Sequence, residues 1–406
     1  MKTLGKILSK YLTPNFYFLV LAAFLLLCSG AQAGAAALVR GPYIENVGED
    51  IATVRFRTDV ATVAWISYGA YPDCERFMTL SPESKEHKIL LFGLLGDTTH
   101  CYRIYLPDSV STGAYKAAEN AFTTFRGDDK PYLNFLAFGD SGSGSEEQLQ
   151  LAAVMEQLTP DFVVHTGDLL ENGLESSADE QYFNPYKKMI AKYPFFIALG
   201  NHDYGKDYNK PDGKKFLKEN YIPYHTMPYT GQPPYYYYFD DGNARFFVLD
   251  TNYFDGAKWA QPLDKNSKQY KWLEHYLSKT DKEWKFVVMH EPLYSTGAHG
   301  GLAAQRAVLE PLLDKYGVDI VLQGHDHDYE RTKPLKDGIP NDQEGIIYIT
   351  LAGGGRPLYF QRNNEDWSEK FMPVYHFAQF EINGPNLKMV VYDKDAKVID
   401  TLEIQK

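Results

Sequence analysis

Residues 133–142 read LNFLAFGDSG, and this stretch decides how the rest of the chain is interpreted. The mostly apolar residues 133–138 predict a buried β-strand, and Gly139 then allows a sharp turn of the backbone. Asp140 follows the turn directly, at the end of the strand where α/β sheets carry their ligand crevice. A helix is predicted over residues 145–158, with serine capping boxes at its start. Strand, turn and helix together predict the first unit of an α/β domain.

Four further apolar segments end in polar residues in the same way. These strands are predicted at residues 162–165, 195–199, 286–289 and 320–322, and they end in TGD (166–168), GNHD (200–203), HEP (290–292) and GHDH (324–327). Further strands at 246–249 and 346–351 and helices at 268–278 and 302–315 complete a pattern of strands and helices in alternation. Because the carboxyl ends of parallel strands meet at one edge of a sheet, we expect the five ends to lie together.

The side chains that these strand ends deliver are of metal-binding type. They are Asp140, Asp168, Asn201, His290, His325 and His327. Oxygen and imidazole donors without a thiolate suit Zn, Fe or Mn. Each motif alone is weak evidence, since Gly96-Asp97 repeats one of them inside a turn near the N-terminus. Five motifs in order, each at a strand end, predict a shared metal site.

Residues 38–126 have a different pattern, with short alternating strands and no helix. Strands are predicted at 51–58, 63–68, 87–92 and 100–106, and their spacing favours a small antiparallel β-sandwich. Cys74 and Cys101 both lie in this part of the chain. The sequence is compatible with a disulfide between them and equally with two small buried side chains. A polar linker ending in Pro131 separates this part from residues 131–406, which end in hairpin strands over 377–404.

The first 33 residues predict a secretory signal peptide. A lysine-rich start, an apolar run over residues 16–27 and the sequence AQA at 31–33 form its three parts. The run is too short to span a membrane comfortably. We therefore expect a secreted, periplasmic or cell-surface protein; lipoprotein processing before Cys28 is the alternative, disfavoured by the bulky Leu27. The formal net charge of -12 predicts that no nucleic-acid-binding surface is present.

The order of the motifs resembles the calcineurin-like metallophosphoesterases, and more closely their purple acid phosphatase branch. The motifs that carry the resemblance are GDSG (139–142), GD (167–168), GNHD (200–203), His290 and GHDH (324–327). The N-terminal part resembles a fibronectin type III module through RGPY (40–43), GLLG (93–96) and FTTF (122–125). The resemblance implies an all-β sandwich followed by a four-layer α-β-β-α metallophosphoesterase domain.

The same resemblance implies a role for each candidate metal ligand. Asp168 would bridge two metal ions. Asp140 and His327 would complete the protein ligands of one ion. The other ion would be held by Asn201, His290 and His325.

The sequence departs from the family at one ligand position. A tyrosine that ligates Fe(III) is expected three residues after Asp168, and Glu171 stands there instead. The two metal ions would be Fe, Zn or Mn, and the missing phenolate argues against Fe(III), a purple colour and an acid optimum. Glu171 is either a replacement ligand or an exposed loop carboxylate.

The predicted activity follows from the chemistry of two metal ions held close together. Such a pair clamps the attacking and leaving oxygens of an in-line displacement and supplies hydroxide near neutral pH. We predict an exported phosphoric ester hydrolase, an acid phosphatase-like enzyme that cleaves phosphomonoesters of small molecules by metal-hydroxide attack at phosphorus. The alternatives are a phosphodiesterase or nucleotide pyrophosphatase on the same scaffold, and a surface binding protein whose metals are only structural.

Several residues outside the ligand set are candidates for supporting roles. His202 and His299 are predicted to stabilise phosphoryl charge and to protonate the leaving oxygen. Asp203 and Asp326 either orient imidazoles or cap loops. Arg356, in the sequence GGGR at 353–356, is either a phosphate contact or a surface residue of a tight turn.

Overall fold

The computed structural model describes residues 36–108, 113–128, 130–205, 213–254, 256 and 260–406. The predicted signal peptide and Cys28 lie outside these residues. Within the described part of the chain, no helix is both long enough and apolar enough to cross a membrane.

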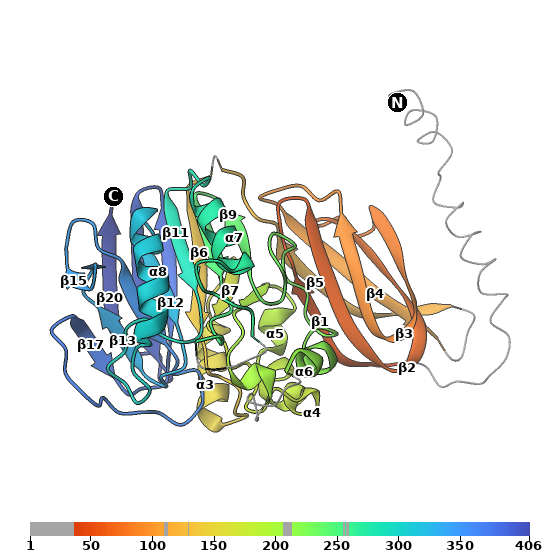
Figure 1. The fold of residues 1–406 in the computed structure, drawn as a ribbon. Coiled ribbons are helices and arrows are strands. Elements are labelled where there is room, and N and C mark those ends of the chain that lie inside the picture. The colour runs from red at the N-terminus through yellow and green to blue at the C-terminus, as the bar shows by residue number, and fades with distance from the viewer. Residues whose placement is uncertain (1–35, 109–112, 129, 206–212, 255, 257–259) are drawn as a thin grey trace.

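The N-terminal part is an antiparallel β-sandwich formed by one continuous five-stranded sheet with long, bent strands (Figure 1). Its strands are β1 (Leu38–Glu45), β2 (Ile51–Ala70), β3 (Phe77–Phe92), β4 (Thr99–Pro107) and β5 (Ala114–Thr123). The first half of β2 pairs with β1 and the second half pairs with β4, while β3 pairs with both halves. The strands predicted at 51–58 and 63–68 are therefore two halves of one strand, with an irregular register between Arg57 and Thr62.

Cys74 and Cys101 form a disulfide, with their Cα atoms 5.1 Å apart. The bond joins the turn that follows β2 to strand β4. Of the two alternatives that the sequence left open, the disulfide is the one observed, and it ties together segments 27 residues apart.

The C-terminal part contains two sheets that face each other. One sheet has the order β20-β19-β18-β6-β7-β8, with β6 (Tyr132–Phe138), β7 (Phe162–His165), β8 (Phe195–Ile197), β18 (His376–Asn383), β19 (Asn386–Asp393) and β20 (Val398–Gln405). The other has the order β17-β13-β16-β12-β11-β10-β9, with β9 (Tyr237–Asp241), β10 (Ala244–Val248), β11 (Trp284–Val288), β12 (Ile320–Gln323), β13 (Tyr329–Thr332), β16 (Ile347–Leu351) and β17 (Ser368–Met372). Strands β6, β7 and β8 are parallel to one another, as are β10, β11, β12 and β16. A small hairpin of β14 (Leu335–Lys336) and β15 (Ile339–Pro340) lies apart.

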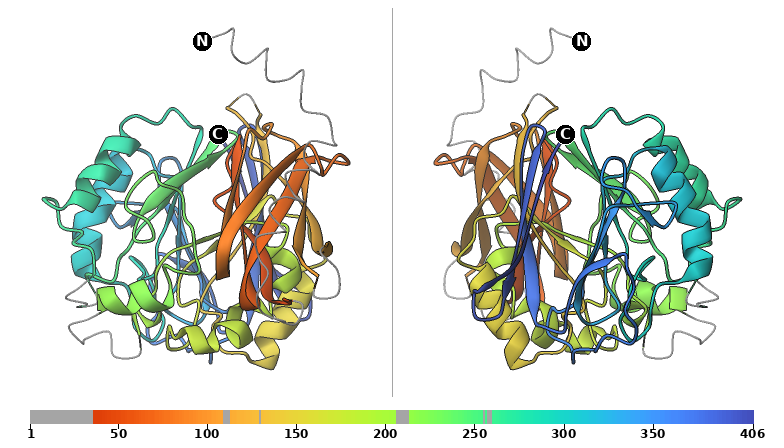
Figure 2. Two further views of the ribbon diagram at one scale, coloured as in Figure 1. Left: turned by 90° about the vertical axis from the view of Figure 1, so that its right-hand side faces the viewer. Right: turned by 90° about the vertical axis from the view of Figure 1, so that its left-hand side faces the viewer.

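Helices cover the outer faces of the two sheets, which completes the predicted four layers (Figure 2). Helices α7 (Lys268–Leu277) and α8 (Ala303–Lys315) pack on the seven-stranded sheet. The helical segments beside the six-stranded sheet are α3 (Glu146–Met155), α4 (Glu175–Ala178), η1 (Asp179–Phe183), α5 (Lys187–Ile190), η2 (His202–Tyr204) and α6 (Gly213–Asn220). Helix α3 begins at its N-cap Ser145, whose hydroxyl accepts a hydrogen bond from the Gln148 amide. The predicted start of this helix is therefore confirmed.

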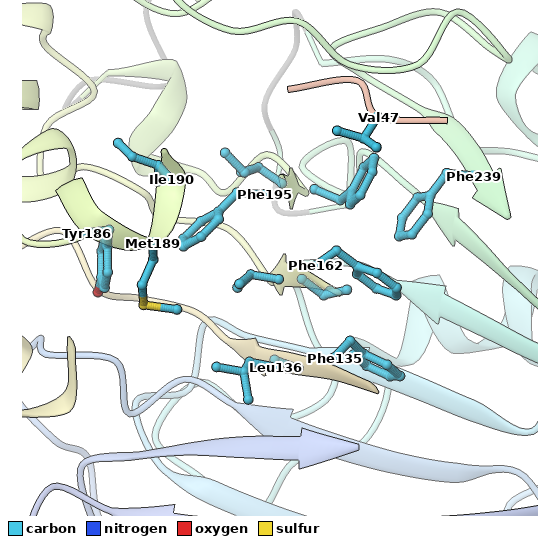
Figure 3. Close-up of a cluster of buried hydrophobic side chains, with 14 of the residues drawn as sticks. Val47, Phe135, Leu136, Phe162, Tyr186, Met189, Ile190, Phe195 and Phe239 are labelled. Carbon is cyan, nitrogen blue, oxygen red and sulfur yellow. The ribbon is translucent and has the colours of Figure 1, made fainter. Parts of the chain in front are cut away.

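Stacked aromatic rings fill the space between the two sheets (Figure 3). Phe135 of β6 stacks on Phe162 of β7, with 5.2 Å between ring centroids, and meets Phe246 and Phe286 of the facing sheet edge-on. On the opposite side of β6, Leu136 points toward the helical layer that contains Met189. Successive side chains of a strand point to opposite faces of its sheet, so one face of each sheet packs on the other sheet and the opposite face packs on helices.

The sandwich is joined to the α/β part by an apolar and a polar contact. Phe125, just after β5, packs against the rings of Phe162, Phe196 and Phe239. The polar contact is a set of pairs from buried residues of β1 and β2: Arg40 with Glu175 and Asp179, Glu45 with His225 and Thr226, and Arg55 with Thr226. The sandwich is therefore held against the α/β part by both kinds of contact.

Candidate metal centre

The six predicted ligands lie at the carboxyl ends of strands from both sheets. Asp140, Asp168 and Asn201 follow β6, β7 and β8 of the six-stranded sheet. His290 follows β11, and His325 and His327 follow β12 of the facing sheet. Because the two sheets face each other, their strand ends converge and bring the two groups of side chains together.

The backbone at this centre is held in unusual conformations. Asp140, Asp168 and His325 have φ angles of 54°, 55° and 70°, in the left-handed region that side chains other than glycine rarely adopt. A side chain at Gly200 would meet the Asp168 carboxylate, since an added Cβ would lie 2.2 Å from its Oδ1. The strand ends therefore approach each other so closely that glycine is required beside the ligands, and the surrounding contacts must offset the backbone strain.

Asp140, Asp168 and His327 form one compact donor group. One ligand atom from each lies within 4.8 Å of the others, and all three residues are buried. His327 donates through Nδ1 to the Pro357 carbonyl at 2.7 Å, which leaves its Nε2 lone pair facing Asp140 Oδ1 at 3.5 Å. That buried carboxylate oxygen has no hydrogen-bond partner in the described residues. A cation between these atoms would satisfy both of them.

Asn201, His290 and His325 form a second donor group around one nitrogen. His290 Nε2 lies 3.1 Å from Asn201 Oδ1, 3.2 Å from His325 Nδ1 and 3.5 Å from Asp168 Oδ1. His290 donates through Nδ1 to the Thr166 carbonyl at 2.9 Å. A neutral His290 therefore points its Nε2 lone pair at the Asn201 oxygen, and two acceptors at this distance require a proton or a metal ion between them. The arrangement fits a metal site.

The electrostatics of the centre also favour cations. Burial alone would raise the pKa of the Asp168 carboxyl, but the positive charges of His290, His202 and Arg356 hold it well below its usual range. Burial opposes a charge on His290, yet the carboxylates of Asp168 and Asp140 raise its pKa to about 9. The raised pKa of His290 shows a negative field at that ring, where a bound cation could take the place of the proton. The lowered pKa of Asp168 shows that nearby positive charge stabilises its carboxylate.

The two predicted non-ligand histidines lie beside the donor groups. The backbone N–H of His202 donates to Asp168 Oδ1 at 2.9 Å, and its Nε2 lies 3.9 Å from Asp168 Oδ2. Its side chain is 31% exposed, so this side of the centre is open to solvent. The His299 ring centroid lies 4.3 Å from that of His325. Each imidazole is therefore close to one group of ligands.

Asp203 and Asp326 cap loops rather than orient imidazoles. The Asp203 carboxylate accepts backbone N–H bonds from Asp168, Leu169 and Gly200 at 2.9–3.0 Å. Burial and the neighbouring Asp168 carboxylate raise the pKa of Asp203 to about 7. Asp326 accepts from the backbone N–H groups of His299 and Gly300. These carboxylates fix the loops that carry the candidate ligands and His299.

Two residues near the centre were missed or misjudged from the sequence. The interpretation of Arg356 as a surface residue is wrong, because it is only 8% exposed and donates to Asp168 Oδ2 at 2.7 Å. Tyr359, which no motif indicated, stacks on His327 with 4.2 Å between ring centroids. Glu171 is exposed, and its backbone carbonyl accepts a hydrogen bond from the His202 ring. Both Arg356 and Tyr359 belong to the loop after β16, which lacks a recognisable ligand motif.

Donor groups at the strand ends of two facing sheets define a metallophosphoesterase-type centre, and comparisons with known proteins agree. Residues 133–329 match the family model described as calcineurin-like phosphoesterase. This part of the chain is therefore similar to that family. The family implies divalent metal ions, and the Asp140, Asp168 and His327 group is a possible site for one.

The chain is similar to purple acid phosphatases in particular. It is 26% identical over 297 residues to purple acid phosphatase 4 of Arabidopsis thaliana, covering 64% of this chain and 80% of that one. It is also 26% identical to acid phosphatase type 7 of Mus musculus, covering 65% of each. The solved structure of purple acid phosphatase PPD1 from yellow lupin (Lupinus luteus) seeds shares the fold, with a TM-score of 0.76 and 20% identity over 91% of this chain and 74% of that one. The predicted resemblance, the fold class and the class of phosphoric ester hydrolases are confirmed.

Proposed function

We propose that this protein is an exported phosphatase that hydrolyses phosphomonoesters of small molecules at a dinuclear metal centre. The observation that carries the proposal is the convergence of Asp140, Asp168 and His327 with the second donor group around His290 Nε2. Asp168 contacts both groups, since one of its oxygens faces His290 and its carboxylate also belongs to the compact group. It is therefore our candidate for the shared ligand.

The proposed division of labour follows from the contacts. Asp140, Asp168 and His327 would hold one ion, and Asn201, His290 and His325, with Asp168, would hold the other. Two divalent ions held here would supply an activated water and screen the charge of the phosphoryl group. The carbonyls of Thr166 and Pro357 fix the tautomers of His290 and His327, so that each presents a lone pair to the centre.

His202 and His299 are our candidates for contacts with the substrate. His202 lies on the solvent-accessible side of Asp168, where a phosphate ester has access. Its Nδ1–H is bonded to the Glu171 carbonyl, so Nε2, which also lies 3.3 Å from Arg356 Nη2, is the ring nitrogen that would exchange a proton with a leaving oxygen. His299 lies beside His325 and can donate a hydrogen bond to a phosphoryl oxygen on that side.

We further propose that both ions are divalent and that the protein is colourless. The position expected to hold the Fe(III)-binding tyrosine is occupied by Glu171, which is exposed. Divalent ions polarise water less than a trivalent ion, so the pH optimum should be neutral to mildly alkaline. A visible absorption spectrum of the isolated protein tests this. A phenolate charge-transfer band that disappears in Tyr359→Phe would instead make Tyr359 the missing ligand.

Export is supported by the disulfide between Cys74 and Cys101, since such bonds persist in oxidising compartments. The proposed localisation is secreted, periplasmic or at the cell surface. Mass spectrometry of the protein isolated from its native cells checks this, because cleavage after Ala33 and an oxidised cysteine pair are expected together.

Metal analysis combined with a panel of phosphate esters tests the proposed activity. We expect about two equivalents of divalent metal and turnover of p-nitrophenyl phosphate that chelation abolishes and metal restores. Bis(p-nitrophenyl) phosphate, which has the same leaving group, separates monoesterase from diesterase activity. Metal binding without turnover of any ester would contradict the proposal and favour a binding protein.

A further inference from the structure

Arg356 places a buried positive charge at the edge of the candidate metal centre. Its Nη1 donates to Asp168 Oδ2 at 2.7 Å, and its Nη2 lies 3.3 Å from both ring nitrogens of His202. A guanidinium group stays charged at any physiological pH. Arg356 therefore contacts both the proposed shared ligand and the histidine on the solvent-accessible side of the centre.

The loop that carries Arg356 is fixed by the loop that carries Asp140. Gly354 donates from its backbone N–H to the Gly139 carbonyl at 3.0 Å, and Arg356 donates from its own to the Asp140 carbonyl at 3.2 Å. The hydroxyls of Ser143 and Ser145 both donate to the Gly355 carbonyl, at 3.0 and 2.9 Å. The position of the guanidinium is therefore tied to the position of a proposed metal ligand.

Close packing makes this placement demanding. An added Cβ at Gly354 would lie 2.2 Å from the Gly139 carbonyl oxygen, and Gly355 has a φ of 149° with Gln148 beside it. Neither position accepts a side chain without displacement of the backbone. The close packing therefore holds the backbone of Arg356 next to the proposed metal ligand Asp140.

The balance of charges at the centre indicates a role for Arg356. Asp168 has one carboxylate, and the proposed function requires it to bind two cations. With two divalent ions bound, Arg356 would add a further positive charge next to their proposed shared ligand Asp168, and an additional anion would offset its repulsion. An incoming phosphoryl group supplies that charge, and its oxygens match the guanidinium donors in geometry.

We propose that Arg356 binds a non-bridging oxygen of the substrate phosphoryl group and thereby selects phosphomonoesters over phosphodiesters. A monoester carries up to two negative charges and three non-bridging oxygens, whereas a diester carries one charge and two such oxygens. A fixed additional cation therefore stabilises the monoester more strongly. The inference rests on the proposed function and assigns its substrate class to a particular residue.

The test compares Arg356→Gln and Arg356→Lys with the wild-type protein in metal-loaded form. Three quantities are measured: metal content, kcat/KM for p-nitrophenyl phosphate and bis(p-nitrophenyl) phosphate, and the calorimetric Kd of inorganic phosphate. Arg103→Gln is the matched control, since Arg103 pairs with two carboxylates on the sandwich, far from this loop in the sequence.

We expect Arg356→Gln to retain its metals and to lose about 10²–10³-fold in kcat/KM for the monoester, but less than about tenfold for the diester. Phosphate binding should weaken about tenfold or more. Arg356→Lys, which keeps the charge without the planar fork, should recover part of both losses. The control should match the wild type.

Equal losses on both esters, unchanged phosphate binding, or loss of metal from both variants would overturn the inference, because Arg356 would then only support Asp168. Failure of the proposed function gives a different result, in which the wild-type protein turns over neither ester. In that case, weaker phosphate binding by Arg356→Gln than by the wild type would still support a contact between Arg356 and the phosphoryl group. Equal phosphate binding by the two proteins would refute that contact.

Discussion

Two aspartates that each follow a glycine have similar φ angles in this molecule and opposite surroundings. In the sandwich, Asp97 has a φ of 51°, and in the α/β part Asp168 has a φ of 55°. The Asp97 side chain is 39% exposed and lies 3.5 Å from Arg126 and 3.7 Å from Lys130 across the surface. Asp168 is 1% exposed and faces two histidines and an arginine.

The comparison shows which part of a metal-binding motif is local. Glycine followed by aspartate produces a left-handed turn in both places, because aspartate tolerates this conformation better than most residues. Only the convergence of other strand ends turns one of these aspartates into a candidate ligand. The four predictions below test that difference, from the largest expected effect to the smallest.

Asp168→Asn should cost more activity than any other change at the centre, about 10⁴-fold or more. It removes the only charge that the two proposed cations share and leaves them poorly screened from each other. Steady-state assays and metal analysis of the variant check this. A variant with two bound metals and near-normal turnover would show that Asp168 is not the bridge.

His202→Ala and His299→Ala should each lower turnover by about 10²–10⁴-fold while metal content stays unchanged. The residue that donates the proton should matter less for esters with good leaving groups. His275→Ala is the control, since that histidine is exposed on α7. If neither variant slows hydrolysis of an alkyl phosphate, both assignments are incorrect.

The sandwich should lose stability in mild acid through His87. Burial lowers the pKa of His87 from 6.5 to about 4, and its ring nitrogens contact the hydroxyls of Ser81 and Thr58. Below pH 6.5 His87 becomes protonated in the unfolded chain but stays neutral in the folded protein down to about pH 4. Its contribution to the free energy of unfolding is therefore fully present above pH 6.5 and decreases as the pH falls toward 4. The slope is at most about 1.4 kcal/mol per pH unit. Melting curves across this range should be flatter for His87→Gln; an identical slope would exclude His87 as the cause.

Asp97→Asn should change almost nothing. Asparagine also tolerates a positive φ, and the lost ion pairs lie at the surface, where they are worth about 1 kcal/mol or less. Turnover should stay within about twofold of the wild type, and metal content should be equal. A large loss of activity would mean that the sandwich turn acts on the centre, against the contrast drawn above.

Much of the fold followed from local pattern. The apolar strands at 133–138, 162–165 and 320–322 lie within one residue of their observed bounds, because a buried parallel strand is a short apolar run bounded by turn residues. The division of the sandwich strands was less accurate. Residues 51–70 form one bent strand, and the bend depends on pairing with three different partners, which no local signal encodes.

At the candidate centre, the six ligand candidates were recognisable because each stands at the end of an apolar strand. Arg356 and Tyr359 were not, because their place depends on how the loop after β16 packs against residues 139–145. The glycines at 353–355 were the available signal. Three in a row predict a tight turn, but they do not say what the turn approaches.

The polar contact between the sandwich and the α/β part has a consequence for cooperativity. Arg40 and Glu45 are each 4% exposed, and their partners Asp179 and His225 belong to the other part. Separating the two parts would break these pairs and would expose the contacts of Phe125 with Phe162, Phe196 and Phe239 to water, which is unfavourable. The two parts should therefore melt in a single transition, and a cut in the linker at 127–130 should leave them associated.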